Sequence, residues 1–471
     1  MSTVDSSPVD AGRSRSRALI GTAGAVTGLA LSAVVGPFVQ APTLWGLVPI
    51  VLYAVLALVG MDIVVATVIA VISALLIMLP TPAQIGDLLG ESLGDQVTVI
   101  GMVIMLGAGV GEILRTTGIA ATIVRGVMRV VGERNRTAAT LGVMLSCLVL
   151  VASLGTLAGA LAIAAPLLLP VVARLGFTRS ATASMMFIGG CAGLALAPFA
   201  GSNVAIMSAA EVGYPLYLLY GAGPLAVLSL VAGLLIVPWM QRRTEGAADH
   251  YDAADLGATD ENPVAGRGRA TAAFAIALVA SVCYAVVSGA GTTFPLLALP
   301  VLGIVAGLAG GLGPTQIAAQ MYAGAARLVH VFLLFWLLAV LFAGIDALQP
   351  FQVLLDTYGT SMRGLSPFVF ALLIAVLGWV GVPGATAAQV VLLDKVFGGL
   401  AASVGIGAGA WVVVLLFASK ADTYGPFPNA NMVGAMSLAR STNLKNTLLT
   451  GFALLVPCCL MYAAILFFET R

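Results

Sequence analysis

The stretches APFAGSNVAIMSA (residues 197–209) and GPFPNANMVGAMS (residues 425–437) decide the fold of this chain. Each contains Pro-Phe, a run of small residues, an Asn, and then Met and Ser in apolar surroundings. Because proline removes a backbone donor and bends or ends a helix, each stretch predicts a break inside an apolar helix. Two matched breaks, half a chain apart, indicate an internal repeat.

Composition places the whole chain in a lipid bilayer. Of its 471 residues, 60% are hydrophobic and only 9% are charged, whereas a soluble protein carries about 25% charge. We therefore expect an all-α polytopic membrane protein. The net charge of +1 argues against a nucleic-acid partner, and only two His argue against haem or zinc chemistry. The five Cys lie in apolar runs and are expected to be unpaired.

Apolar runs long enough to span the membrane divide the chain into two halves. Runs of about 20 apolar residues predict about 11 transmembrane helices. The expected units are a tail and first helix at 1–42, a first repeat at 43–240, a linker at 241–269 and a second repeat at 270–471. The linker is polar and acidic, so we expect it to be mobile.

Each repeat is expected to contain a hairpin and a broken helix. The stretches 137–172 and 364–398 are too long for one helix and have small residues in the middle, so we interpret them as re-entrant hairpins. The broken helices follow at 180–212 and 403–438. The arginines of the N-terminus and of the loops place the N-terminus and the linker in the cytoplasm, at the cell membrane. Five crossings per repeat, an odd number, make the second repeat inverted.

A shared binding site near the bilayer midplane would explain the matched breaks. Broken helices leave backbone groups unpaired, and their ends carry partial charges that suit a small anionic substrate or Na⁺. Single Ser or Thr residues can equally serve helix packing. The expected substrate-binding residues are Ser153, Gly155, Thr156, Gly159, Ser202, Asn203, Gly381, Pro383, Gly384, Thr386, Gln389, Thr423, Asn429 and Asn431.

Lys420 and Asp422 are the charged residues within a predicted span that most strongly suggest a function. Charges at that depth are costly and are usually functional. We assign them, with Asn203 and Asn431, to the coupling ion. The alternatives are a mutually compensated pair, or a Lys that extends toward the interface.

The remaining charged residues near helix ends have a structural interpretation. Asp394 and Lys395 would form an exposed pair at the outer mouth of the second hairpin. Glu112 and Asp346 precede amphipathic stretches at 116–131 and 348–360, which are typical of interfacial arm helices. His330 would be a residue at the membrane boundary.

Repeated five-helix units with an arm helix, a re-entrant hairpin and a broken helix resemble the ion transporter superfamily. The likeness covers about residues 43–468. Of the Ser-Asn-Thr signature of the divalent-anion symporters, Gly201-Ser202-Asn203-Val204 keeps only Ser-Asn. The resemblance implies an elevator mechanism, in which hairpins and broken helices move as a block against a scaffold that forms a homodimer.

We therefore expect a secondary active transporter of a small organic anion, a carboxylate, driven by Na⁺ or H⁺. The alternative is a Na⁺/H⁺ antiporter on the same fold, with Asp422 as the carrier carboxylate. No GxxxxGK[ST] or HExxH motif and no His-rich cluster occurs, which argues against an ATP-driven pump and against an enzyme. No cofactor other than Na⁺ is expected.

Overall fold

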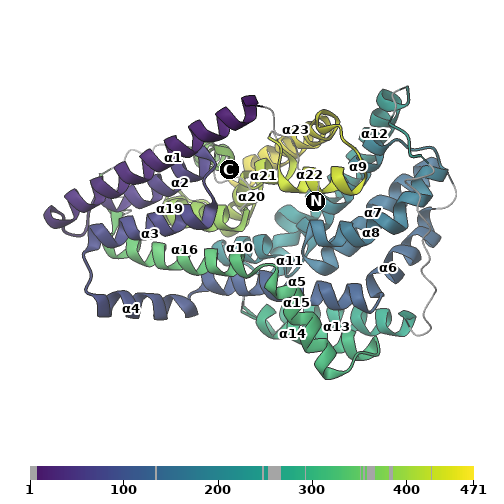
Figure 1. The fold of residues 1–471 in the computed structure, drawn as a ribbon, viewed down its shortest axis with the longest axis horizontal. Coiled ribbons are helices and arrows are strands. Elements are labelled where there is room, and N and C mark those ends of the chain that lie inside the picture. Colours follow the sequence, from purple (N-terminus) through teal and green to yellow (C-terminus); the bar gives the residue numbers. More distant parts are fainter. Residues whose placement is uncertain are drawn as a thin grey trace.

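The computed structural model describes residues 8–132, 135–246, 249–252, 267–291, 293–350, 352–353, 356–357, 366–380, 386–425 and 427–471. These residues form helices and no strands (Figure 1). Eight helices, or nine if one bent pair is a single span, are long and apolar enough to cross a membrane. The prediction of an all-α polytopic membrane protein is thus confirmed. The count of about 11 crossings also uses shorter apolar helices, such as Leu44–Val59, and stays a prediction.

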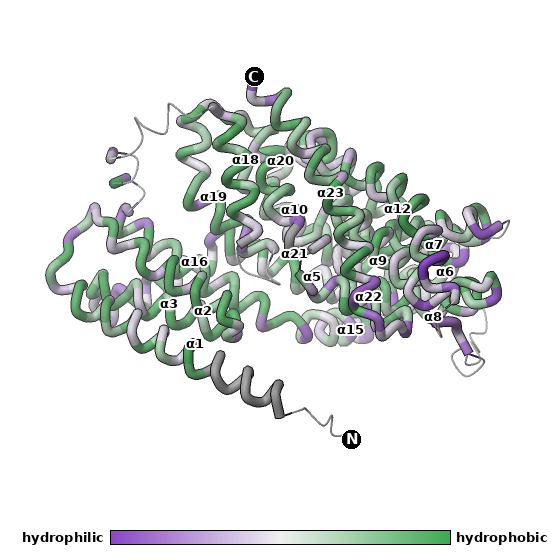
Figure 2. The backbone as a smooth tube through the Cα atoms, turned by 90° about the horizontal axis from the view of Figure 1, so that it is seen from above, coloured by the Kyte–Doolittle hydropathy of each residue, from purple (hydrophilic) through white to green (hydrophobic). Residues whose placement is uncertain are grey.

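Apolar side chains cover the outside of the protein as well as its core. Figure 2 shows hydrophobic residues along nearly all the helices and hydrophilic ones gathered at their ends. Among the exposed large side chains, Val287 is 87% exposed and Leu235 and Phe468 are each 73% exposed. Water would disfavour such surfaces, so these faces contact lipid.

Helices from both halves of the chain pack into one body, which we call the scaffold. It contains α1 (Pro8–Val35), α2 (Val48–Val59), α3 (Ile63–Met78), α4 (Pro82–Glu91), α5 (Gln96–Thr116), α13 (Arg267–Ser288), α14 (Pro295–Ala309), α15 (Pro314–Ala326) and α16 (Val329–Leu348). Short 3₁₀ turns lie at Gly36–Phe38, Leu44–Leu47 and Ser92–Gly94. Helix α5 packs against α14, α15 and α16, and α3 packs against α16. The two repeats are therefore interleaved rather than separate.

The first hairpin is formed by α7 (Arg136–Leu154) and α8 (Leu157–Arg174). Gly155 makes the turn at its tip with a φ of 69°, which favours glycine. Its two open ends meet, since Arg136 Nε donates to the Leu175 carbonyl oxygen at 3.0 Å. The chain thus enters and leaves this hairpin at the same end.

The first broken helix follows directly. Helices α9 (Arg179–Leu196) and α10 (Gly201–Ala209) are bent by 42° at the Pro198 break. Then come α11 (Tyr214–Tyr217), a π-helical segment (Leu218–Ala222) and α12 (Gly223–Thr244). The first arm, expected at 116–131, is α6 (Ile119–Val127) with a π-helical end (Met128–Gly132).

The second repeat has the same order of elements. Its hairpin is α18 (Pro367–Leu377), a 3₁₀ turn (Gly378–Val380) and α19 (Thr386–Ser403). Its broken helix is α20 (Ala408–Ala418), α21 (Lys420–Tyr424) and α22 (Ala430–Leu438), followed by α23 (Leu444–Glu469). The boundary predicted at 398–403 is wrong, because α19 runs to Ser403 and the next helix begins at Ala408. Most of the arm expected at 348–360 lies outside the described residues.

The two repeats exchange contacts. Helix α10 of the first broken helix packs against α19 of the second hairpin. In return, α22 of the second broken helix packs against α8 of the first hairpin and against α9. Each hairpin therefore supports the broken helix of the other repeat, which brings the two breaks together.

The first residues of the linker are docked. Helix α12 runs to Thr244, and residues 249–252 lie against the start of α9. Asp249 accepts from the Arg179 and Ser180 amides at 2.7 and 3.0 Å, and Tyr251 donates to the Ala439 carbonyl at 2.9 Å. The expectation of mobility is wrong here, because Asp249 satisfies unpaired donors at a helix start. Residues 253–266 lie outside the described residues.

The sequence interpretation missed α4 and α15. Both begin with proline, and a glutamine two residues later bonds back to the residue before the proline. Gln84 Oε1 accepts from the Thr81 amide at 2.8 Å, and Gln316 Oε1 accepts from the Gly313 amide at 3.0 Å. The Thr81-Pro-Ala-Gln84 pattern is a helix-start signal that predicts such a helix.

Candidate ion site between the broken helices

A cavity of about 20 Å³ lies where the two broken helices meet. Its walls come from α9, α10, α19, α20 and α21, and thus from both repeats. A space of this size is close to that of one water molecule. The lining residues are Cys191, Leu194, Ala195, Ser202, Asn203, Ile206, Thr386, Leu416, Ser419, Lys420 and Thr423.

Asn203 closes the break in the first repeat. It is 3% exposed, and its Nδ2 donates to the carbonyls of Leu194, Ala195 and Ala197 at 2.8, 3.1 and 2.8 Å. These carbonyls end α9, where helix geometry leaves acceptors without partners. The side-chain oxygen accepts from Ser202 Oγ at 3.3 Å.

Two tyrosines complete the closure of this first break. Tyr214 donates to the Leu196 carbonyl at 2.5 Å, and the buried Tyr217 donates to the Ala195 carbonyl at 2.9 Å. The first break is therefore held by neutral side chains. The carbonyl groups that α9 leaves without helical partners are hydrogen-bonded within the same repeat.

Lys420 is a buried charged residue on α21, just before the second break. It is 4% exposed, and its Nζ lies 5.4 Å from the centre of the Tyr424 ring. The Tyr424 hydroxyl is held by Ser229 at 2.8 Å. Among the described side chains, no carboxylate lies within salt-bridge distance of Lys420. The side chain of Asp422 is outside the described residues.

Two hydroxyl side chains line the same cavity as Lys420. Ser419 Oγ donates to the Leu416 carbonyl at 2.7 Å, and Thr423 Oγ1 donates to the Ser419 carbonyl at 3.0 Å. Their protons are thereby used inside the helix, so their lone pairs stay available to a donor or a cation.

The structure gathers five of the predicted site residues at this cavity. They are Ser202, Asn203, Thr386, Lys420 and Thr423. Gly381, Pro383 and Gly384 lie outside the described residues.

Other predicted residues lie elsewhere. Of those at the first hairpin tip, Ser153 bonds to its own helix, Gly155 lies against Ala200, and Thr156 and Gly159 begin α8. Gln389 is buried and donates to the Gly378 carbonyl within the second hairpin. These residues are outside the lining of the cavity.

The expected pairing of Asn203 with Asn431 is shifted by one residue. Helix α10 starts at Gly201 and α22 starts at Ala430, so Asn203 corresponds to Met432. Asn429 instead caps α22, with its Oδ1 accepting from the Met432 amide at 2.9 Å. Asn431 is half-buried and outside the cavity lining.

Cys191 and Ser419 are lining residues that the sequence interpretation missed. Ser419 is next to Lys420 and could have been included on that ground. Cys191 lies on α9, two turns before the break, and nothing in its apolar sequence context distinguishes it.

Charged residues at the helix ends tie other elements together. Glu112 is 5% exposed and pairs with Arg115 and with Arg327, the latter at 3.0 Å, which fits a structural role. The expected pair of Asp394 with Lys395 is wrong. Lys395 Nζ bonds instead to Asp346 of the scaffold at 3.1 Å, and Asp394 accepts from Trp411 Nε1 at 2.9 Å.

Comparison with known proteins agrees with this fold. The model of the Na⁺/H⁺ antiporter family matches residues 22–238, slightly less than half of the chain. No curated protein matches the sequence.

Two solved structures have a similar fold. The Alcanivorax borkumensis YdaH transporter is 16% identical, with a TM-score of 0.61 over 96% of this chain and 98% of that one. Neisseria gonorrhoeae MtrF, described within a class of antimetabolite efflux pumps, is 13% identical, with a TM-score of 0.58 over 93% of this chain and 96% of that one. The chain thus has the fold of a multi-pass membrane transporter.

Proposed function

We propose that this protein is a secondary active transporter that exchanges Na⁺ for H⁺ across the cell membrane, with its N-terminus in the cytoplasm. The observation that carries the proposal is the size and content of the cavity between the broken helices. Its volume of about 20 Å³ suits one dehydrated ion, and it is too small for the carbon skeleton of an organic acid. The match to the Na⁺/H⁺ antiporter family supports the same choice.

Electrostatic exclusion at Lys420 would couple the two ions. Burying an unpaired charge costs free energy, and a second cation within the same small cavity would add strong repulsion. The cavity therefore accepts either a proton on Lys420 Nζ or a Na⁺ ion. The oxygen atoms of Asn203, Thr386 and Thr423 would replace part of the water shell of Na⁺.

Asp422 is the second candidate proton carrier. It follows Lys420 by two residues, on the same short helix α21. Residues two apart on a helix point in different directions, so the two charges compensate each other poorly. A carboxylate here would attract Na⁺ and release a proton in exchange.

Transport would require the hairpins and broken helices to move against the scaffold, as a block within a homodimer. The ion pair between Asp346 of α16 and Lys395 of α19 joins these two bodies. It is partly exposed, with side chains 53% and 38% accessible, so solvent would lower the cost of opening it.

Reconstitution into proteoliposomes distinguishes exchange from organic-anion symport. Vesicles with an imposed proton gradient and a pH-sensitive dye are given Na⁺ without any carboxylate. We expect collapse of the gradient that depends on Na⁺ and on the protein. Gradient-driven uptake of labelled carboxylates, with no effect of Na⁺ on the proton gradient, would overturn the proposal in favour of symport.

A further inference from the structure

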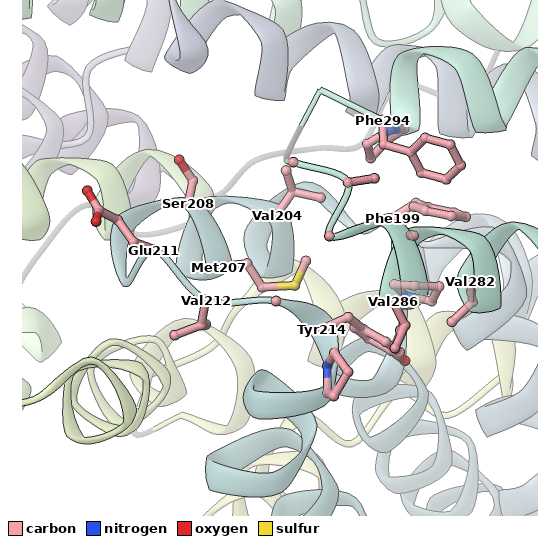
Figure 3. Close-up of a pocket in the computed structure, with 18 of the residues that line it drawn as sticks. Phe199, Val204, Met207, Ser208, Glu211, Val212, Tyr214, Val282, Val286 and Phe294 are labelled. Atoms are coloured by element: carbon pink, nitrogen blue, oxygen red, sulfur yellow. The ribbon is translucent and has the colours of Figure 1, made fainter.

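A second and much larger cavity, of about 440 Å³, lies outside the ion site (Figure 3). It is formed between the end of the first broken helix, α10 and α11, and the ends of α13 and α14 of the scaffold. Its volume is in the range of cavities that hold small organic molecules. None of the residues that line the ion site, Lys420 included, is among its lining residues, so it is a separate site.

The walls of this cavity are apolar and aromatic. Phe199, Tyr214 and Phe294 line it, together with the aliphatic side chains of Val282 and Val286. The Tyr214 ring is fixed, because its hydroxyl is bonded to the Leu196 carbonyl and its ring stacks on Tyr217. Aromatic faces carry partial negative charge and attract cations.

Glu211 is the one charged residue among the described residues that line the cavity. It is exposed and lies at one end, whereas Phe199 and Phe294 lie at the other (Figure 3). The cavity thus combines an apolar aromatic body with an anionic end. No Lys, Arg or His occurs among these lining residues, which disfavours an anionic ligand.

The local structure disfavours a glutamate at this position. Glu211 directly follows the C-terminal cap of α10 in a left-handed conformation, with a φ of 52°, where glycine or asparagine is usual. The C-terminal end of a helix carries partial negative charge, which repels a carboxylate. Asp394 of α19 lies close enough to Glu211 for the two carboxylates to repel each other, although Lys395 offsets part of the charge of Asp394. A glutamate at this position is therefore unfavourable for the helix end, which suggests that it serves a ligand.

We propose that this cavity binds an amphipathic aromatic cation, an organic amine or pyridinium that carries one positive charge. Its ring would lie between Phe199, Tyr214 and Phe294, and its charge would be directed toward Glu211. The ligand would contact both the broken helix of the first repeat and the scaffold helices of the second.

Direct binding tests this assignment without reference to ion exchange. The purified protein, in nanodiscs of neutral phosphatidylcholine, is titrated with the fluorescent cation dimethylaminostyryl-methylpyridinium. Anilinonaphthalene sulfonate serves as an aromatic anion of similar size. We expect saturable binding of the cation and no saturable binding of the anion at this site.

Two substitutions from different elements locate the binding. Glu211→Gln keeps the shape of the side chain and should weaken cation binding by about tenfold, because it removes the one charged group among the described lining residues. Val286→Trp should weaken the binding strongly by narrowing the cavity. The matched controls are Glu91→Gln, an exposed glutamate at the end of α4, and Val279→Trp, two turns earlier on α13 and 61% exposed.

Equal binding of cation and anion, or cation binding that survives Glu211→Gln unchanged, would overturn the proposal and leave an apolar cavity filled by lipid. Because the readout is binding, loss of Na⁺/H⁺ exchange in separate vesicles would leave this result intact. The two proposals can therefore fail independently.

Discussion

The two broken helices have similar sequences and occupy similar places, but their breaks are stabilised differently. In the first, Asn203, Tyr214 and Tyr217 bond to the carbonyls that end α9, and all three are neutral. In the second, Lys420 lies on the short helix α21 just before the break, and it is buried without a carboxylate partner among the described side chains. The repeat thus provides two helix breaks of similar shape, whereas the buried ionisable side chain occurs beside only one of the described breaks.

The difference has a physical cause. Two buried charges of the same sign at one small cavity would repel each other strongly in a low dielectric. Pseudo-symmetry would place equivalent ammonium groups side by side. Keeping one break neutral avoids that cost and still provides oxygen atoms for a cation.

The largest expected effect concerns the side of the membrane to which each hairpin opens. Arg174 and Ser403 are exposed residues at the open ends of the first and second hairpins. In a Cys-free background, Arg174→Cys should react with a membrane-impermeant maleimide only from the cytoplasm, and Ser403→Cys only from outside.

Ala265→Cys, in the linker, serves as the cytoplasmic reference. Phe177 is unsuitable for such labelling because it is 3% exposed. Labelling of both hairpin positions from the same side would disprove the inversion on which the comparison of the two breaks depends.

Loss of the buried ammonium should abolish exchange. We expect Lys420→Gln to stop Na⁺-dependent collapse of a proton gradient, because the cavity then carries no group that excludes Na⁺. Its thermal stability should stay the same or rise, since the substitution removes a buried charge that has no carboxylate partner among the described side chains and is costly to keep out of water. Lys445→Gln, at an exposed position in α23, is the control. Early melting with normal exchange would make Lys420 a structural residue.

Asp422→Asn should also abolish or uncouple exchange, while expression and melting temperature change little. The reason is that the amide cannot release a proton, whereas its size and hydrogen-bonding capacity are almost those of the carboxylic acid. If Asp422 instead pairs with Lys420 or Arg440, the substitution should destabilise the protein by about 3–5 kcal/mol. Measuring transport and melting temperature on the same preparation separates these roles.

Substitution of Asn203 and of Asn431 should affect stability more unequally than the sequence alone predicts. Sequence alone predicts that Asn203→Ala and Asn431→Ala each weaken ion binding in a folded protein. From its contacts, Asn203→Ala should also destabilise the protein by about 1–3 kcal/mol, because it leaves buried carbonyls unpaired. Asn431→Ala should change stability by less than about 0.5 kcal/mol. Equal losses, measured by thermal unfolding and by Na⁺ titration of exchange, would contradict this distinction.

The sequence by itself determined the class of fold and the position of its breaks. Hydrophobic run length identifies membrane helices because lipid leaves no partner for exposed backbone groups. Proline and glycine locate the breaks at Pro198 and Gly425 for local steric reasons. The small polar residues beside these breaks and the hairpin tip pointed to Ser202, Asn203, Thr386 and Thr423, and the cost of a charge within a span pointed to Lys420.

Only the tertiary structure decided which of these groups meet. Sequence spacing made Asn431 the equivalent of Asn203 in the second repeat, but the first residues of α10 and α22 shift this correspondence by one residue. Contacts such as Asp346 with Lys395, or Asp249 with the start of α9, join residues that are distant in the chain and have no local signature. Cavity volume is likewise set by packing between helices. Periodicity can predict which face of a helix is buried, but the space left between five helices depends on all their side chains together.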